Sequence, residues 1–393
     1  MADVNDINEL RSKLKRMSPE ERARLHKLIS SAPVSEAPAV RTNSGNRWFD
    51  RPITGLNAEG MAKLKELEKR LNNDMFMSAR VDMKQVNYLK KLKKMKLQVP
   101  SFFRNTVDPR RMYQHLRSFC INNDIPEEII TRVVPALVTY IETGHMRPII
   151  LVGEKGCGKT TALRMLVEEA LQLHTEIIKV PQADGSHGIT GHCGSFYNAD
   201  VGLLSRARFK SKKLLNAYVF DEIDKVTHSQ THASIDDELL SITDESNDSI
   251  VDNYLDTTIV GLEYCPMFFT ANDLTRINPI LVDRCTVIRF PNANKERIKA
   301  IMAKYVNNKL SGTCYKLISI DMKLMNKYID ILVDHDVTSL RKHQQLIEIV
   351  LQNALNVALT SQGNDKTEVT EQMFREASEA ILGIEKHKIG FAA

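Results

Sequence analysis

Residues 149–160 constrain the fold of this chain more than any other segment. The apolar run IILV at 149–152 has the composition of a buried β-strand, and it passes into GEKGCGKT, a complete match to the phosphate-binding pattern GxxxxGK[ST]. The residues that follow, 161–166, favour a helix. Because this order of strand, glycine-rich turn and helix places an anion at a helix N-terminus, the segment predicts a nucleotide-binding α/β fold.

The residues of this loop have distinct expected roles. Backbone N–H groups of a glycine-rich turn can point inward at a phosphate, and Lys159 adds a point charge for the β- and γ-phosphates. The Thr160 hydroxyl is of the type that ligates Mg²⁺, so we expect ATP and Mg²⁺ to bind here. The residues expected to surround the phosphates are Gly153, Glu154, Lys155, Gly156, Cys157, Gly158, Lys159, Thr160 and Thr161. The alternative, a turn that matches the pattern by accident, is disfavoured by the flanking strand and helix.

Composition limits the class of protein. With 393 residues the chain can bury a large core and form two or three domains. No apolar run approaches the roughly 20 residues of a membrane span, and the first ten residues lack the layout of a signal peptide. The six cysteines are scattered without a CxxC pair, which is typical of free thiols in a reducing compartment. We therefore expect a cytoplasmic protein that does not enter a membrane.

The chain is expected to have five parts. They are an N-terminal helical segment at 1–30, a linker at 31–60, a basic helical region at 61–130, an α/β core at 131–291 and a C-terminal α-helical lid at 292–393. In the core, predicted strands at 149–152, 176–180 and 217–220 alternate with helices, which indicates a parallel sheet covered by helices on both faces. One helical stretch is expected at 110–141. Trp48, in the linker, is interpreted as a packing anchor.

Polar side chains follow two further apolar strands. Asp221 and Glu222 end one of them; in a metal-dependent nucleotide hydrolase Asp221 would hold Mg²⁺ through water, and Glu222 would orient or deprotonate the attacking water. Asn272 follows the strand at 267–270 and can hydrogen-bond the water or the γ-phosphate, unless it only caps the next helix. Arg284, near the end of a short helix, can reach a neighbouring subunit's γ-phosphate or pair with Asp283 or another acid of its own chain.

Four segments resemble the motifs of one known family, in the same order. They are GHCGSFYNADVG at 191–202, DEIDKV at 221–226, TAN at 270–272 and ILVDR at 280–284. Together with the phosphate loop they resemble an AAA+ ATPase, and in detail the ATPase module of the Lon protease family, from about residue 133 to the end. The resemblance implies a ring, expected to be hexameric, with Asn272 as sensor 1 and Arg284 as the arginine finger. It also implies that Phe196 and Tyr197 belong to a pore loop that grips a protein substrate.

The sequence departs from the Lon pattern in two places. Where Lon carries a sensor 2 arginine, residues 336–341 read DVTSLR, so either Thr338 replaces that arginine or Arg341 serves one turn later; we favour Arg341. Residues 381–388 resemble the approach to the Lon protease domain, and the sequence ends at Ala393. We therefore expect a Lon-like ATPase without a protease of its own.

Basic residues crowd the region before the nucleotide motif. They are Arg80, Lys84, Lys90, Lys91, Lys93, Lys94, Lys96, Arg104, Arg110 and Arg111. They could bind nucleic-acid phosphates, although lysines opposite a leucine face suit a solvated helix surface equally well. The expected function is therefore an ATP-driven AAA+ motor that threads or remodels a protein client, or activates a partner effector. The alternatives are a nucleic-acid-associated AAA+ ATPase, such as a loader or a regulator of a nuclease or transposase, and a scaffold that does not hydrolyse ATP.

Overall fold

The computed structural model describes residues 47–73, 82–105, 108–183, 188–193, 199–225, 235–244, 250–360 and 366–383. The chain divides into two compact units, 1–46 and 47–393, and every described residue belongs to the second. The expectations for the helical segment at 1–30, for Arg80, and for Phe196 and Tyr197 fall outside the described residues. Among those that are described, no helix has the length and apolar character needed to cross a membrane.

Five parallel strands form the central sheet of the described α/β core. They are β1 (Ile149–Val152), β2 (His174–Lys179), β3 (Asn216–Asp221), β6 (Met267–Ala271) and β7 (Thr286–Arg289), in the order β2-β3-β6-β1-β7. Residues 217–220 and 267–269 of the middle strands are apolar and buried, as is typical of strands covered on both faces. This sheet confirms the predicted fold class. The carboxyl ends of parallel strands share one edge, so the residues that follow β1, β3 and β6 come together there.

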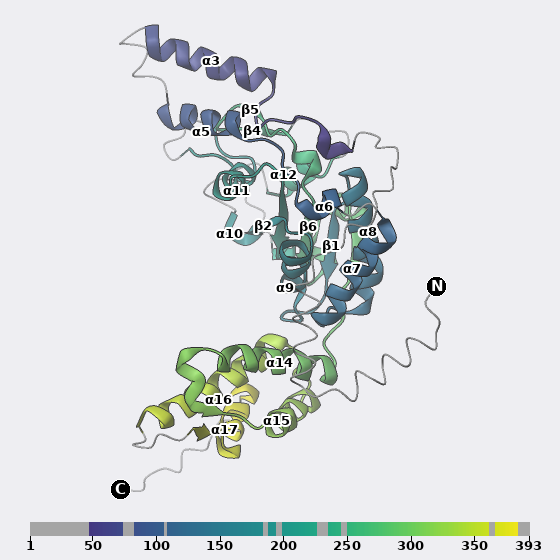
Figure 1. The fold of residues 1–393 in the computed structure, drawn as a ribbon, viewed down its shortest axis with the longest axis vertical. Coiled ribbons are helices and arrows are strands. Elements are labelled where there is room, and N and C mark those ends of the chain that lie inside the picture. The colour runs from purple at the N-terminus through teal and green to yellow at the C-terminus, as the bar shows by residue number, and fades with distance from the viewer. Residues whose placement is uncertain are drawn as a thin grey trace. The chain divides into compact units, whose positions relative to one another are not determined.

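Helices surround this sheet. They are α6 (Ser101–Asn105), α7 (Pro109–Asn122), α8 (Glu127–Thr143), α9 (Lys159–Arg164), α10 (Val180–Ala183), α11 (Leu203–Ser211), α12 (Ile235–Ile242) and α13 (Pro279–Arg284). In Figure 1 the strands β2, β6 and β1 lie between α10 and α11 on one side and α7 and α8 on the other. The helix predicted after the phosphate loop begins as α9, which passes into a π-helical turn (Met165–Ala170) before β2.

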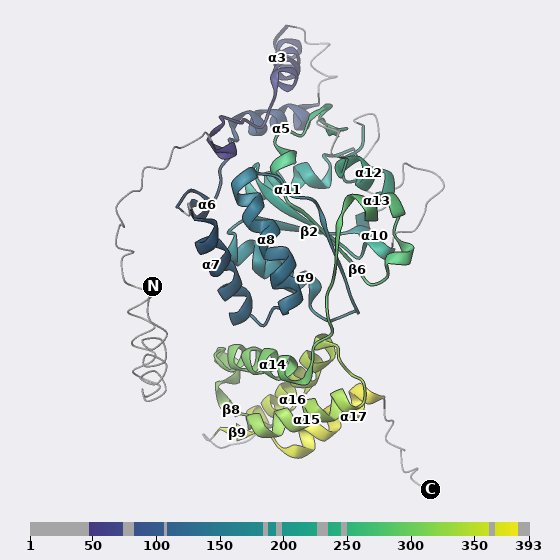
Figure 2. The same cartoon turned by 90° about the vertical axis from the view of Figure 1, so that its right-hand side faces the viewer.

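The helical stretch predicted at 110–141 is two helices. α7 ends at Asn122 and α8 begins at Glu127, and the two pack side by side in Figure 2. Pro126 is the N-cap of α8; proline lacks a backbone N–H and disfavours helix in the residue before it. Asp124, in the turn, has a left-handed backbone with φ 55°. The break brings the residues of this turn to the nucleotide cavity described below.

A second apolar cluster lies within the described residues 293–360 and 366–377. Its helices are α14 (Lys295–Leu310), α15 (Met322–Asp334), α16 (Leu340–Thr360) and α17 (Glu371–Leu382). Met302, Ile329, Leu346 and Phe374 are fully buried in it. Two short strands, β8 (Ile318–Ser319) and β9 (Thr367–Glu368), also pair here, which the purely helical expectation did not include.

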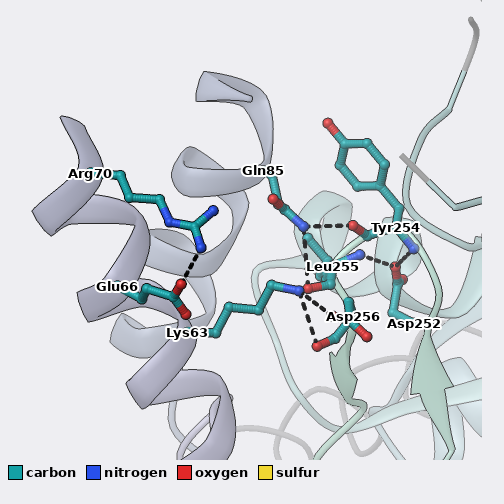
Figure 3. A network of polar contacts seen from close by, with 8 residues as sticks. All are labelled: Lys63, Glu66, Arg70, Gln85, Asp252, Tyr254, Leu255 and Asp256. Carbon is teal, nitrogen blue, oxygen red and sulfur yellow. Dashed lines mark hydrogen bonds and ion pairs between the residues drawn. The ribbon is translucent and has the colours of Figure 1, made fainter. Parts of the chain in front are cut away.

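Two basic helices, α3 (Ala58–Asn73) and α5 (Met83–Lys94), pack against each other and against a turn of the core. That turn joins β4 (Val251–Asp252) to β5 (Thr257–Thr258). Leu64 and Leu89 are buried with Leu255 in the contact. Figure 3 shows its polar part, in which Lys63 reaches Asp256 and the Gln85 side chain donates to the Tyr254 and Leu255 carbonyls.

Trp48 is a packing anchor, as expected. Its indole Nε1 donates to the Ile141 carbonyl at 3.1 Å, and its ring stacks on Tyr264 with the ring centroids 5.0 Å apart. Trp48 and the neighbouring Phe49 lie in a 3₁₀ turn (Trp48–Asp50), and both are buried. The large apolar surface that the two rings bury attaches this part of the predicted linker to the α/β core.

Candidate nucleotide-binding site

A cavity of about 610 Å³ lies at the edge of the sheet where the strands end. Its lining includes Lys155, Gly156, Gly158, Lys159, Thr160 and Thr161 from the phosphate loop, and Asp221, Glu222, Thr270 and Asn272 from the ends of β3 and β6. Helices α14 and α16 contribute residues to the same cavity. The sequence motifs that lie far apart along the chain thus meet in one place.

The phosphate loop depends on its glycines. Gly156 has φ 82° and Gly158 has φ 103°, the left-handed region that glycine adopts without strain. A Cβ atom on Gly156 would lie 2.2 Å from the Ser339 hydroxyl oxygen, at the start of α16. The Leu340 N–H also donates to the Gly156 carbonyl at 3.0 Å. The loop and the first turn of α16 are therefore in direct contact.

Lys159 is buried at the centre of the loop. Its ammonium donates to the Gly153 and Glu154 carbonyls at 2.7 and 2.9 Å and to Asn272 Oδ1 at 3.1 Å. Burial lowers the pKa of this ammonium, against the opposing effect of nearby anionic groups. Asn272 in turn donates from Nδ2 to the Asp224 carboxylate at 3.3 Å, so its amide is fixed in one orientation between the two charges.

Thr160 and Asp221 form the part of the site suited to a divalent cation. The Thr160 hydroxyl donates to Asp221 Oδ1 at 2.8 Å. Hydroxyl and carboxylate oxygens are hard donors that fit Mg²⁺, which keeps several waters and takes its other ligands from phosphates. Within the described residues no group of three acidic, histidine or cysteine side chains could hold a metal by itself. The residues present therefore fit a Mg²⁺ ion that arrives with a nucleotide.

Thr270 is not among the residues predicted from the sequence, and it connects the two acidic residues. Its hydroxyl donates to Asp221 Oδ1 and accepts from the Glu222 N–H at 3.2 Å. Glu222 has a left-handed backbone, φ 62°, a conformation that costs a non-glycine residue roughly 1–3 kcal/mol and that often occurs at functional sites. The Glu222 carboxylate pairs with Lys225 at 2.6 Å. A hydroxyl residue at the end of the neighbouring strand was the signal that could have identified Thr270.

The two predicted arginines lie in different places. Arg341, in α16, lines the cavity, whereas Thr338 is not among its lining residues. Arg284 does not line the cavity: its guanidinium pairs with Asp244 at 2.9 Å and donates to the Leu240 carbonyl. The pair with an acid of its own chain, which the sequence left open, is therefore present in the single subunit.

Sequence reasoning missed the contribution of α14. Arg297 is half-buried in the cavity wall, where its Nε donates to the Asp124 carbonyl at 2.8 Å and its guanidinium lies over the Phe290 ring. Ile125 and Tyr305 offer an apolar and an aromatic surface in the same wall. Only the break between α7 and α8 brings this turn to the site, and a pattern that predicts one continuous helix gives no sign of it.

The basic region is partly neutralised within the chain. Lys84 pairs with Asp200, Lys90 with Glu68, Arg104 with Asp50 and Arg111 with Asp108. Lys93, Lys94 and Lys96 are exposed at the end of α5.

A parallel sheet with a phosphate loop after β1 and carboxylates after β3 defines a P-loop nucleotide-binding protein. Residues 149–292 match the family described as ATPase family associated with various cellular activities (AAA), so the chain contains an AAA ATPase domain.

Over this region the domain is Lon-like. The chain is 24% identical over 307 residues to a Lon protease homolog of Acanthamoeba polyphaga mimivirus, an alignment that covers 75% of this chain and 28% of that protein. It is 32% identical over 180 residues to a Lon protease of Methanosphaera stadtmanae, covering 44% of this chain and 21% of that one. The chain thus spans less than a third of the length of these relatives.

A solved structure of Hsp104 shares the fold. The closed state of Hsp104 with ATPγS and FITC casein aligns with a TM-score of 0.51 and 14% identity, over 65% of this chain and 49% of that chain. At this identity the likeness bears on the fold alone.

Proposed function

We propose that this protein is an ATP-hydrolysing AAA+ motor that acts as a ring and remodels or threads a protein client, or activates a partner effector. The observation that carries the proposal is the convergence of Lys159, Thr160, Asp221, Glu222 and Asn272 on one cavity. A scaffold that only binds nucleotide would not need an acid held by a strained backbone beside the phosphate loop.

Each residue has a role in the proposed reaction. Lys159 and the N–H groups of the loop bind the β- and γ-phosphates, and Asn272 contacts the γ-phosphate or the water. Glu222 orients the attacking water and accepts its proton. Mg²⁺, held by the Thr160 hydroxyl and by Asp221 through water, would offset the charge that develops on the phosphates. Arg341, which lines the cavity, would sense the nucleotide from α16.

Arg284 is proposed to act on the nucleotide of a neighbouring subunit. It precedes β7, whereas the phosphate loop follows β1, and these two strands pair in parallel. The two features therefore lie at opposite ends of the paired strands, roughly 13 Å apart for a four-residue strand. An arginine at the amino-terminal end of the strands cannot serve its own cavity, but in a ring it can stabilise transition-state charge in the cavity of the next subunit.

Protein remodelling is favoured by the similarity of the chain to Lon proteases and by the similarity of residues 191–202 to a pore loop. We propose that Phe196 and Tyr197 grip the client by apolar contact. The nucleic-acid alternative depends on Lys93, Lys94 and Lys96, because other cations of the region are paired within the chain.

Two variants tested side by side separate these functions. Replacing Phe196 and Tyr197 with Ala should leave basal ATP hydrolysis within a few-fold of wild type but abolish stimulation by an unfolded protein such as casein. Replacing Lys93, Lys94 and Lys96 with Gln should do little to that stimulation. The opposite result would be loss of stimulated ATP hydrolysis in the lysine variant and its retention in the aromatic variant. If DNA or RNA also stimulates the wild type in a salt-dependent way, the nucleic-acid function replaces the proposed motor function.

A further inference from the structure

The pairing of β1 with β7 places Arg147 beside Arg284, the predicted arginine finger. β1 and β7 pair in parallel with Ile149 opposite Thr286, and the Thr286 N–H donates to the Pro148 carbonyl at 2.7 Å. The residue two positions before β1 is thereby brought next to the residue two positions before β7. These are Arg147 and Arg284.

The Arg147 guanidinium contacts the main chain of Arg284, not its side chain. Its Nε donates to the Arg284 carbonyl at 3.0 Å, and its Nη2 donates to the Asp283 carbonyl. Both carbonyls belong to the last residues of α13, which ends at Arg284. The last carbonyls of a helix have no partner within the helix, and a cation there also interacts favourably with the helix dipole. Arg147 thus holds the end of α13 at two points.

The Arg284 side chain is held from another direction. It reaches Asp244 and the Leu240 carbonyl, at and just beyond the end of α12. To reach a neighbouring subunit, the Arg284 guanidinium would have to leave Asp244 and the Leu240 carbonyl. The contacts of Arg147 do not involve this guanidinium, so they would not oppose its movement. The main chain of Arg284 can therefore stay fixed while the side chain changes partner.

We propose that Arg147 is the positioning residue of the arginine finger: by holding the Asp283 and Arg284 carbonyls it aims the Arg284 side chain at the neighbouring subunit's γ-phosphate. This inference rests on the proposed action of Arg284 in trans. The Arg147 guanidinium is engaged by the Asp283 and Arg284 carbonyls, so it acts through Arg284 as a positioning residue and not as a catalytic one.

The role requires an arginine. A guanidinium presents several N–H donors in a rigid fork and can serve two carbonyls at once, whereas the lysine ammonium is a single point on a flexible stem. Arg147 is exposed and lines a second cavity, of about 500 Å³, with Asp244 and His145. Its removal therefore takes no side chain out of the packed core, and the Arg147→Ala variant should fold.

The first test is kinetic. Arg147→Ala should lower kcat for ATP hydrolysis roughly 10- to 100-fold, the effect expected of a misplaced catalytic group, and leave the dissociation constant for ATP unchanged. Arg132→Ala, which removes an exposed arginine from α8 of the same core, is the matched control and should hydrolyse ATP normally. Arg147→Lys should stay impaired, because one ammonium cannot hold both carbonyls.

The second test is mixing of subunits. Arg147→Ala subunits mixed with Glu222→Gln subunits should regain activity, because a site can then combine an intact Glu222 with a correctly aimed arginine from its neighbour. Arg147→Ala mixed with Arg284→Ala should regain nothing, and the double variant should be no slower than Arg284→Ala alone. A purely structural role would give losses that add and no such pattern of recovery.

The outcomes distinguish this inference from the function beneath it. If Arg284→Ala hydrolyses ATP at the wild-type rate, or if a monomer is fully active, the action in trans is wrong. If Arg284→Ala loses activity as expected while Arg147→Ala behaves like the Arg132→Ala control, or adds its loss to that of Arg284→Ala, the positioning role of Arg147 is wrong. Full activity of Arg147→Lys would overturn it as well.

Discussion

The Thr160 hydroxyl donates to the Asp221 carboxylate at 2.8 Å, which joins the helix after the phosphate loop to the end of β3. These are the two side chains proposed to hold Mg²⁺. The hydrogen bond keeps two separate elements at the spacing that a shared ion requires.

Removing the Thr160 hydroxyl should uncouple ATP binding from Mg²⁺. Thr160→Ala should weaken the affinity for ATP in the presence of Mg²⁺ by about tenfold or more, and should hardly change it in EDTA, because the lost group contacts the ion. Thr160→Ser keeps the hydroxyl and is the control. Equilibrium titration of each variant with and without Mg²⁺ measures the effect; equal losses in both conditions would show that Thr160 has only a structural role.

Replacing Glu222 with Gln should separate binding from hydrolysis. The amide keeps the shape of the side chain but cannot accept a proton from water, so ATP should bind normally while turnover falls roughly 10²- to 10⁴-fold. Glu168→Gln, at an exposed position of the π-helical turn, is the control. Measurement of both dissociation constants and steady-state rates decides the matter, and unchanged turnover would mean that another residue activates the water.

Adding a methyl group to Gly156 should separate α16 from the phosphate loop. The new Cβ would lie 2.2 Å from the Ser339 oxygen on a backbone with φ 82°. Gly383→Ala is the matched control, since Gly383 has φ 70° and open space around its position. We expect Gly156→Ala to weaken ATP binding at least about tenfold, and Gly383→Ala to show only the roughly 1 kcal/mol strain of the left-handed backbone. Equal ATP affinity of the two variants would show that the contact with Ser339 does not matter for binding.

His343 should make the free energy of unfolding sensitive to acid. It is fully buried in α16, its Nε2 is 2.8 Å from the Val337 carbonyl, and burial lowers its pKa. The unfolded chain therefore binds a proton more tightly than the folded one, so stability falls as the pH drops below the ordinary histidine value of about 6.5. His343→Gln, which can still donate to Val337, should lose this part of the pH dependence, and His335→Gln at an exposed site should retain it. Thermal unfolding between pH 7.5 and 5 measures the difference.

Local patterns predicted most of the nucleotide site. The loop at 153–160 and the acidic pair after β3 could be placed because a parallel sheet brings the ends of its strands to one edge. Thr270 could not be singled out, since its value lies in a hydrogen bond to a residue 49 positions away. Arg297 was missed for a similar reason: its role depends on the left-handed turn at Asp124, which interrupts an otherwise helical pattern.

The positions of Arg341 and Arg284 show where sequence spacing stops being informative. Thr338 and Arg341 are close enough in sequence that spacing could not choose between them, and only the direction in which α16 begins brings Arg341 to the cavity. For Arg284 both expected partners were chemically reasonable. The pair with Asp244 is a long-range contact, so no local pattern contains it.

Trp48 makes the attachment of residues 47–50 to the α/β core measurable in the unmodified protein. It is the single tryptophan of the chain, so the indole fluorescence of the whole molecule arises from one ring. That ring is buried between Tyr264 and the end of α8. If the segment detached while the α/β core stayed folded, water would reach the indole and its emission would shift to longer wavelength before the helical circular dichroism changed. Tryptophan fluorescence therefore reports on the contact of Trp48 with the α/β core, and circular dichroism reports on the helices of the whole protein.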